Sequence, residues 1–417
     1  MADIDIGRAP ANHIVLPFFG TGALFYLALS ILLLFSGGDW SGHYFTPHFL
    51  ALVHTAALGW GSMIIFGASY QILPVICGCD LFSPLLARAS FICLTMGVLF
   101  LVPSFWWFRP GWTMITGGTL VVIAAVFYNI NAFYTTGTCK RYATQRLFIL
   151  SSACWLLLTT IAGLLLAVNL GHPFIFRNLL DMLKLHAHAG LAGWFLLLIT
   201  GVSTKLVPMF LLGKSNKTRC LYISFVAQNA GLLLFVIDGL VNGPSYRFLL
   251  YAALVALGVI AWMIWLIDCF RNRARKALDW PMKQVLLSFP FLLLSFLFIP
   301  LVYFSTRPKW TLVYGLFLFL GWITSILLGM TFKTLPFIVW NGRYKNLNGK
   351  IKIPMPKQLY KEQWVSWQLI THLCSLLLLV AGVALQEMLL IRLALWIGLA
   401  TAVLYTVNAF KVILHRL

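Results

Sequence analysis

The chain has 417 residues, of which 61% are hydrophobic and only 10% are charged, and its formal net charge is +20. Apolar runs longer than 18 residues recur along its whole length, which excludes a water-soluble globular protein and indicates a protein that crosses a membrane many times. The basic residues are concentrated between these runs, so the positive charge reflects membrane topology, and nucleic acid is not an expected partner.

The lengths of the apolar runs predict twelve membrane-spanning helices. In chain order they lie at about residues 14–36, 48–76, 87–105, 112–134, 147–169, 186–212, 221–241, 248–269, 284–304, 311–339, 365–385 and 389–412. We therefore expect an all-α polytopic membrane protein in which residues 1–417 form a single transmembrane domain.

The distribution of lysine and arginine predicts how the chain is oriented. Twenty of the 30 basic residues lie in the leader, in the loops after the even-numbered spans, and in the tail together with the adjoining end of the last span; six lie in the loops after the odd-numbered spans. By the positive-inside rule, both termini are then cytoplasmic. We expect a multi-pass protein of a bacterial cell inner membrane, with membrane lipid, and anionic lipid in particular, as a partner.

One pattern occurs three times. A starting residue is followed by Gly-Trp after five and six residues, by Gly after thirteen and by Pro after twenty. The starting residues are His54, His188 and Leu316, so the copies are spaced 134 and 128 residues apart and leucine replaces histidine in the third. With twelve spans, this spacing predicts three pseudo-equivalent units of four helices each. The units extend over about residues 14–140, 141–275 and 276–417.

Ionisable residues are costly inside a membrane and therefore mark functional sites. The candidates within the predicted spans are His54, His186, His188 and His372. Carboxylates are missing from the span interiors, which argues against a proton pump or an ion-coupled transporter. Lys333, in the last turns of the third pattern helix, is interpreted as a snorkelling residue near the inner interface.

His54 and His188 begin equivalent copies of the pattern and are expected at the same depth. Two neutral imidazoles that face each other across an apolar gap are what a six-coordinate haem iron requires, so we expect this pair to be axial haem ligands. The alternative is that the two side chains form hydrogen bonds between helices. His186 lies two residues from His188 and so points about 200° away, toward a second haem or a copper ion. His372 is a further candidate ligand there, although its depth argues against a shared site.

Two arginines lie in aromatic-rich outer loops, Arg109 within Phe105–Trp112 and Arg307 before Trp310. One interpretation is that these loops are interfacial anchors. The other is that Arg109 or Arg307 pairs with an anionic group such as a haem propionate.

The segment that begins with His186-Ala-His188 and continues to Gly193-Trp194 resembles the tenth helix of haem-copper oxidase subunit I, especially of its cytochrome c-dependent high-affinity class. The segment around His54 resembles the second helix of that family, and twelve spans in three four-helix arcs resemble its architecture. The resemblance implies a low-spin haem held by His54 and His188 and a high-spin haem held by His186.

The sequence departs from this family at several positions. The His-x-His motif stands on the sixth span instead of the tenth, no His-His pair occurs, and the copper-binding triad is not recognisable. The pattern is closer to the shorter NnrS-type membrane haem-copper proteins, which are linked to nitric oxide tolerance.

We therefore expect a redox protein with one or two haem b groups and with copper as a further candidate. It would exchange electrons with cytochrome c, quinol or other respiratory-complex subunits, and bind or reduce NO or O2 at an outer-side site as an oxidoreductase; whether it is catalytic stays open. Two other classes also stay open. One is a non-enzymatic protein for nitric oxide or metal handling, or for assembly, and the other is a transporter.

Overall fold

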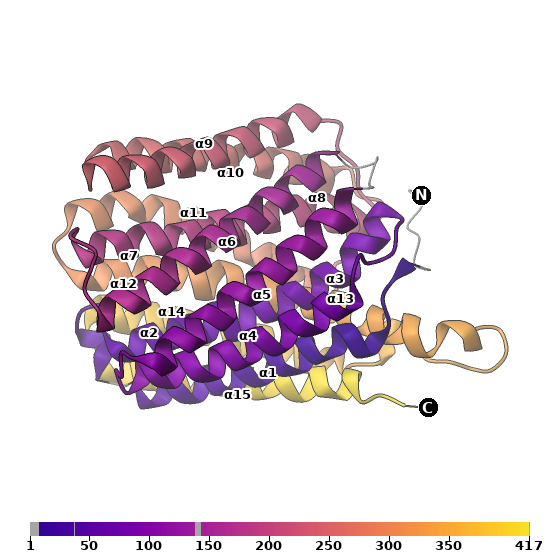
Figure 1. Ribbon diagram of the computed structural model, residues 1–417. Helices are drawn as coiled ribbons and strands as arrows, with labels where there is room; N and C mark the ends of the chain where they lie inside the picture. Colours follow the sequence, from indigo (N-terminus) through magenta and orange to yellow (C-terminus); the bar gives the residue numbers. More distant parts are fainter. Residues whose placement is uncertain (1–7, 37, 138–142, 417) are drawn as a thin grey trace.

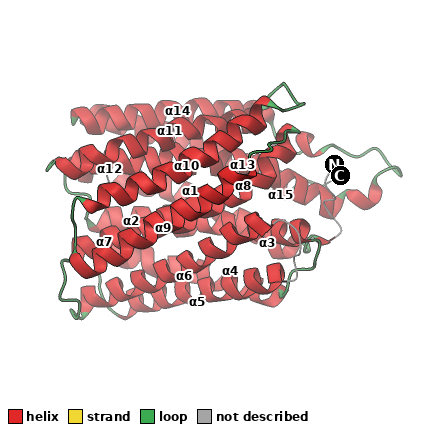
Figure 2. Cartoon of the chain, turned by 90° about the horizontal axis from the view of Figure 1, so that it is seen from above, coloured by secondary structure: helices red, strands yellow, loops and turns green. Residues whose placement is uncertain are grey.

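The computed structural model describes residues 8–36, 38–137 and 143–416. Within these ranges all regular secondary structure is helical, as Figure 2 shows. Twelve helical segments of the described chain are long and apolar enough to cross a membrane. The prediction of an all-helical multi-pass membrane protein is therefore confirmed.

Nine of the spans are single α-helices. They are α1 (Asn12–Phe35), α4 (Pro84–Trp106), α5 (Trp112–Gly137), α6 (Ala143–Gly171), α9 (Thr218–Asn242), α10 (Arg247–Arg271), α11 (Trp280–Phe304), α14 (Glu362–Leu385) and α15 (Met388–Ile413). The other three spans each consist of an α-helix, a π-helical segment and a second α-helix. They are α2 (Pro47–His54), η3 (Thr55–Ser62) and α3 (Met63–Cys77); α7 (Leu179–His188), η4 (Ala189–Leu196) and α8 (Leu197–Leu211); and α12 (Pro308–Gly315), η5 (Leu316–Thr324) and α13 (Ser325–Arg343).

The three composite spans are the ones that carry the repeated pattern, and they form the centre of the bundle. In their most apolar stretches 78%, 61% and 78% of the residues are buried within the protein, against 28–44% for the other nine spans. The outer helices thus present most of their surface to lipid, whereas the pattern helices pack mainly against protein. The last helix closes the bundle on the first, because α15 lies beside α1 (Figure 1) and Thr406 Oγ1 donates a hydrogen bond to the carbonyl oxygen of Ala23 at 3.1 Å. The described ends of the chain lie at the same end of the bundle, the termini end (Figure 1).

Each π-helical segment contains the Gly-Trp of the pattern and begins at or directly after the starting residue of its copy. Helices with this wider turn are rare, and they occur frequently at functional sites. From the sequence these spans are expected to be regular α-helices, because apolar runs reveal the length of a helix but not a local change of its turn. The change of turn alters the direction in which the residues before and after it point.

The glycine of each Gly-Trp allows an aromatic ring of a preceding helix to approach the backbone. Gly59 contacts Phe25 of α1, Gly193 contacts Trp155 of α6, and Gly321 contacts Phe291 of α11. A Cβ atom added at Gly193 would lie 2.6 Å from Trp155 Cγ, which is too close without movement. The tryptophan is also held in place, because its indole Nε1 donates a hydrogen bond to Asn229 Oδ1 at 3.2 Å.

We expect Gly193→Ala to destabilise the protein, since overpacking of a well-packed core costs about 1–3 kcal/mol. Gly315→Ala is the matched control, because no heavy atom outside its own helix lies within 4 Å of a Cβ at that position. Thermal unfolding in detergent micelles should show a lower midpoint for Gly193→Ala and an unchanged or slightly higher one for Gly315→Ala. Equal midpoints would show that the contact with Trp155 can relax.

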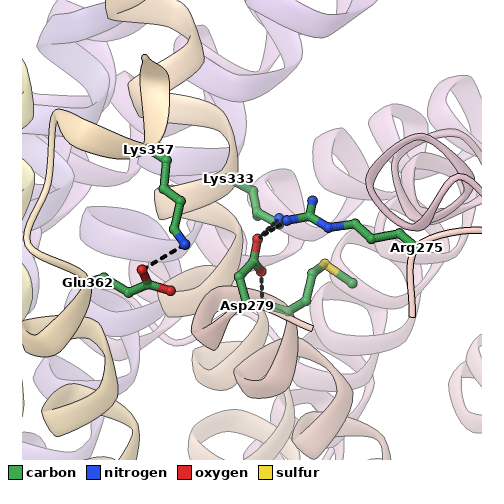
Figure 3. A network of polar contacts seen from close by, with 6 residues as sticks. Arg275, Asp279, Lys333, Lys357 and Glu362 are labelled. Atoms are coloured by element: carbon green, nitrogen blue, oxygen red, sulfur yellow. Dashed lines mark hydrogen bonds and ion pairs between the residues drawn. The ribbon is translucent and has the colours of Figure 1, made fainter. Parts of the chain in front are cut away.

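At the termini end, helix α11 begins with a polar network (Figure 3). Asp279 caps the helix by accepting a hydrogen bond from the backbone N–H of Met282 at 3.2 Å. Its Oδ2 also contacts Lys333 Nζ of α13 at 2.5 Å and Arg275 at 3.3 Å. Lys333 was expected to snorkel toward water, but only 8% of its side chain is exposed. The nearby carboxylate explains the difference, because it neutralises the ammonium group within the protein.

Candidate functional site

Two of the histidines that the sequence singles out lie side by side at the end of the bundle opposite the termini, where α2 and α7 are seen in Figure 1. His54 is the last residue of α2, and His186 lies in the last turn of α7. Their ring centroids are 6.3 Å apart and the ring planes differ by only 16°. The two imidazoles, here called the His54–His186 pair, come from two different pattern helices.

Backbone carbonyl groups orient both imidazoles. Nδ1 of His54 lies 2.7 Å from the carbonyl oxygen of Leu50, and Nδ1 of His186 lies 3.1 Å from that of Thr159 in α6. Because a carbonyl oxygen can only accept, each Nδ1 must carry the hydrogen. In a neutral ring, Nε2 then has the free lone pair, which is the arrangement found in metal-binding histidines.

The surroundings of the pair are apolar. A cavity of about 40 Å³ beside it is lined by both histidines and by hydrophobic side chains of the adjoining helices, among them Phe105, Leu166 and Leu183. The ring of Phe105 lies 4.7 Å from that of His54. His186 packs on Gly163 of α6, where a Cβ atom would come within 2.8 Å of the imidazole Cε1. These contacts fix the orientation of both rings in apolar surroundings.

His188 points into a different interface. Its Nδ1 lies 2.8 Å from the carbonyl oxygen of Lys184, so the hydroxyl of Tyr314 in α12 donates a hydrogen bond to Nε2, at 3.2 Å. The rings of this His188–Tyr314 pair are 6.1 Å apart with an angle of 22° between their planes. Phe235 of α9 packs on His188 at 5.2 Å, much as Phe105 packs on His54.

The two pairs follow one rule. Each contains the starting residue of one pattern copy, together with the residue two positions before the starting residue of the next copy. His186 and Tyr314 are 128 residues apart, the same spacing that separates the second and third copies. Tyr314 is not among the site residues predicted from the sequence, although this spacing could have identified it.

The structure differs from the expected pairing. His186 and His188 point into different sites, as their spacing of two residues predicts. His54, however, lies beside His186, whereas His188 lies beside Tyr314, so the expected meeting of His54 with His188 is not what the structure shows.

The other predicted site residues lie apart from these pairs. His372 is buried in α14, where its Nε2 is 3.0 Å from Ser325 Oγ of α13. Arg109 and Arg307 are exposed in their loops, and within the described ranges no carboxylate forms an ion pair with either of them. Their sequence-based role toward an anionic group therefore stays a prediction.

Among the residues that the structure describes, no three His, Cys, Asp or Glu side chains are grouped closely enough to hold a metal ion. A metal bound by the His54–His186 pair would thus receive two protein ligands. This number suits an iron whose remaining ligands come from a macrocycle, or an ion that accepts two ligands.

Comparisons with known proteins give no family for this chain. No protein-family model matches it, and a search of curated proteins finds no match.

Proposed function

We propose that this protein is a haem-b redox protein of a bacterial inner membrane and that His54 and His186 are the axial ligands of its haem. The observation that carries the proposal is the geometry of this pair. Two near-parallel imidazoles from neighbouring inner helices, each with Nδ1 bonded to a backbone carbonyl, offer two Nε2 lone pairs within an apolar environment.

The proposal includes an arrangement of three pseudo-equivalent four-helix units, similar to that of oxidase subunit I. Four observations support it. The pattern helices are the three most buried spans, each contains a π-helical segment, and the glycine of each Gly-Trp receives an aromatic ring. The fourth is that the His54–His186 and His188–Tyr314 pairs occupy corresponding positions with similar ring geometry.

The donor set fits a haem iron, but the cavity of about 40 Å³ does not by itself hold a macrocycle, since pockets for ligands of such size measure roughly 300–1,000 Å³. Apolar side chains such as Phe105 and Leu166 must therefore separate to admit it. When bound, haem would supply one-electron transfer. The chain would supply two neutral ligands of fixed orientation and apolar walls.

If both histidines held the haem, they would occupy the two positions that the macrocycle does not supply. This favours electron transfer to or from a partner, such as cytochrome c, quinol or a respiratory-complex subunit, over reduction of bound NO or O2 at this site. The proposed location of the pair on the outer side follows from the positive-inside rule, because the pair lies at the end of the bundle opposite the termini.

The test is purification of the full chain from haem-replete cells, followed by optical spectroscopy and metal analysis. We expect about one low-spin bis-histidine haem per chain from the pair geometry. A colourless protein without iron would overturn the proposal.

A second candidate function is the handling of copper or nitric oxide without enzymatic turnover. The small cavity favours it, because a single Cu(I) ion held between two imidazoles needs no room for a macrocycle. The same metal analysis separates the two candidates. Stoichiometric copper without a haem spectrum would support this function and exclude the first.

A further inference from the structure

A groove of about 610 Å³ runs along the lipid-facing surface at the termini end of the bundle. Its apolar wall is formed by Leu24 of α1, by Val407 and Phe410 of α15, and by Leu414, which directly follows α15. Leu24, Val407 and Leu414 have exposed fractions of 52%, 49% and 66%, so the wall is open to the hydrocarbon phase. On the side of Lys411 that faces the middle of the bundle, the α15 wall reaches Val407, about 6 Å away at 1.5 Å per residue, which matches a few methylene groups of an acyl chain.

Two lysines lie at the polar end of this groove. Lys361 precedes α14 and Lys411 lies in the last turn of α15, and both side chains are exposed. The aromatic ring of Trp364 also lines the groove, with Lys361 Nζ 4.5 Å from its centroid. Tryptophan and lysine are the residues that commonly mark the boundary between hydrocarbon and head groups.

The backbone of Lys361 is fixed next to α15. Its N–H donates to Asn408 Oδ1 at 3.0 Å, and its carbonyl oxygen accepts from Asn408 Nδ2 at 3.1 Å. Asn408 is completely buried and lies one helical turn before Lys411. The fold therefore brings two lysines that are distant in sequence to the mouth of one groove.

Neither lysine is neutralised by a carboxylate in the part of the chain that the structure describes. The nearest acidic residue in sequence, Glu362, instead pairs with Lys357 at 2.8 Å (Figure 3). The groove thus combines a positively charged mouth with an apolar wall. A soluble anion would use only the mouth, and a neutral lipid would use only the wall.

We propose that this groove is a specific binding site for an anionic phospholipid, with the phosphate between Lys361 and Lys411 and one acyl chain along α1 and α15. The proposal does not depend on the metal site, which lies at the other end of the bundle. The bound lipid would bridge the first and last helices and thereby stabilise the closure of the bundle.

The experiment is a titration of the full chain in detergent micelles, read by native mass spectrometry, with phosphatidylglycerol and phosphatidylcholine of identical acyl chains. We expect tighter binding of phosphatidylglycerol. Lys361→Gln/Lys411→Gln should weaken it about 30-fold, since each lysine near a head group contributes roughly a factor of five. Lys214→Gln/Lys276→Gln removes the same charge from exposed lysines outside the groove and should bind like the wild type.

Three results would overturn the proposal. They are equal affinity of the wild type for both lipids, equal weakening in the two double variants, and full displacement of the lipid by inorganic phosphate. Val407→Trp adds an independent test, because it fills the apolar wall without a change of charge and should also weaken phosphatidylglycerol binding. A thermal unfolding midpoint for each variant verifies that the protein is folded.

Discussion

His186→Ala should abolish the low-spin haem spectrum as completely as His54→Ala, whereas His188→Ala should retain it. Each of the first two substitutions removes one of the two imidazoles in the His54–His186 pair. A haem iron with a single remaining protein ligand is no longer low-spin and is held less tightly. The measurement is the optical spectrum and the haem content per chain of the purified variants.

His188→Ala should spare the spectrum because the free lone pair of His188 is already used. Its Nε2 accepts the hydrogen bond from Tyr314 at 3.2 Å, in an interface separate from His54. Tyr314→Phe should likewise retain the spectrum, and His172→Ala, at an exposed loop position, serves as a control for the loss of any histidine. If His188→Ala removed the haem and His186→Ala did not, the pairing of His54 with His188 that the sequence suggests would be correct.

Lys333→Met should lower the free energy of unfolding by about 3 kcal/mol, the magnitude expected when one partner of a buried ion pair is removed. Only 9% of the Asp279 side chain is exposed, so the substitution leaves its carboxylate desolvated with Arg275 as the remaining partner. Asp279→Asn/Lys333→Met removes both charges and keeps a side-chain oxygen that can cap α11. The double variant should therefore recover part of the loss in thermal unfolding.

The pH dependence provides the check on this ion pair. Burial raises the pKa of the Asp279 carboxyl, but the hydrogen bond and the charge of Lys333 outweigh this effect, and the pKa lies below its ordinary value. The stabilisation is therefore present above the unfolded pKa of about 4 and is lost as the pH falls through the lower folded value. Wild type and Asp279→Asn/Lys333→Met should converge in stability in this acidic range. A constant difference down to the lowest measurable pH would contradict the assignment.

The helical, membrane-spanning character could be predicted from the sequence, because the length of the apolar runs reports it directly. The pairing of the histidines could not. In the proposed ring of three units, equivalent residues would be related by rotation and would face different interfaces, which accounts for the separation of His54 from His188. The partner of His54 and the partner of His188 each lie two positions before the starting residue of the next copy. Which residue of that copy faces the histidine depends on the rotation of each helix about its axis. That rotation is set by contacts such as His186 on Gly163, which the repeat does not encode.

The rule that relates the two pairs also assigns a third position, where the corresponding residues are Leu316 and Leu52. Both are buried, with exposed fractions of 7% and 4%. The protein would then contain a counterpart of the proposed haem site that lacks both donor atoms but has the same kind of helix with the same π-helical turn. Such an internal reference would allow the contribution of the donor atoms to be measured separately from that of the scaffold, and it offers protein engineers a place to install a new centre without altering the His54–His186 pair.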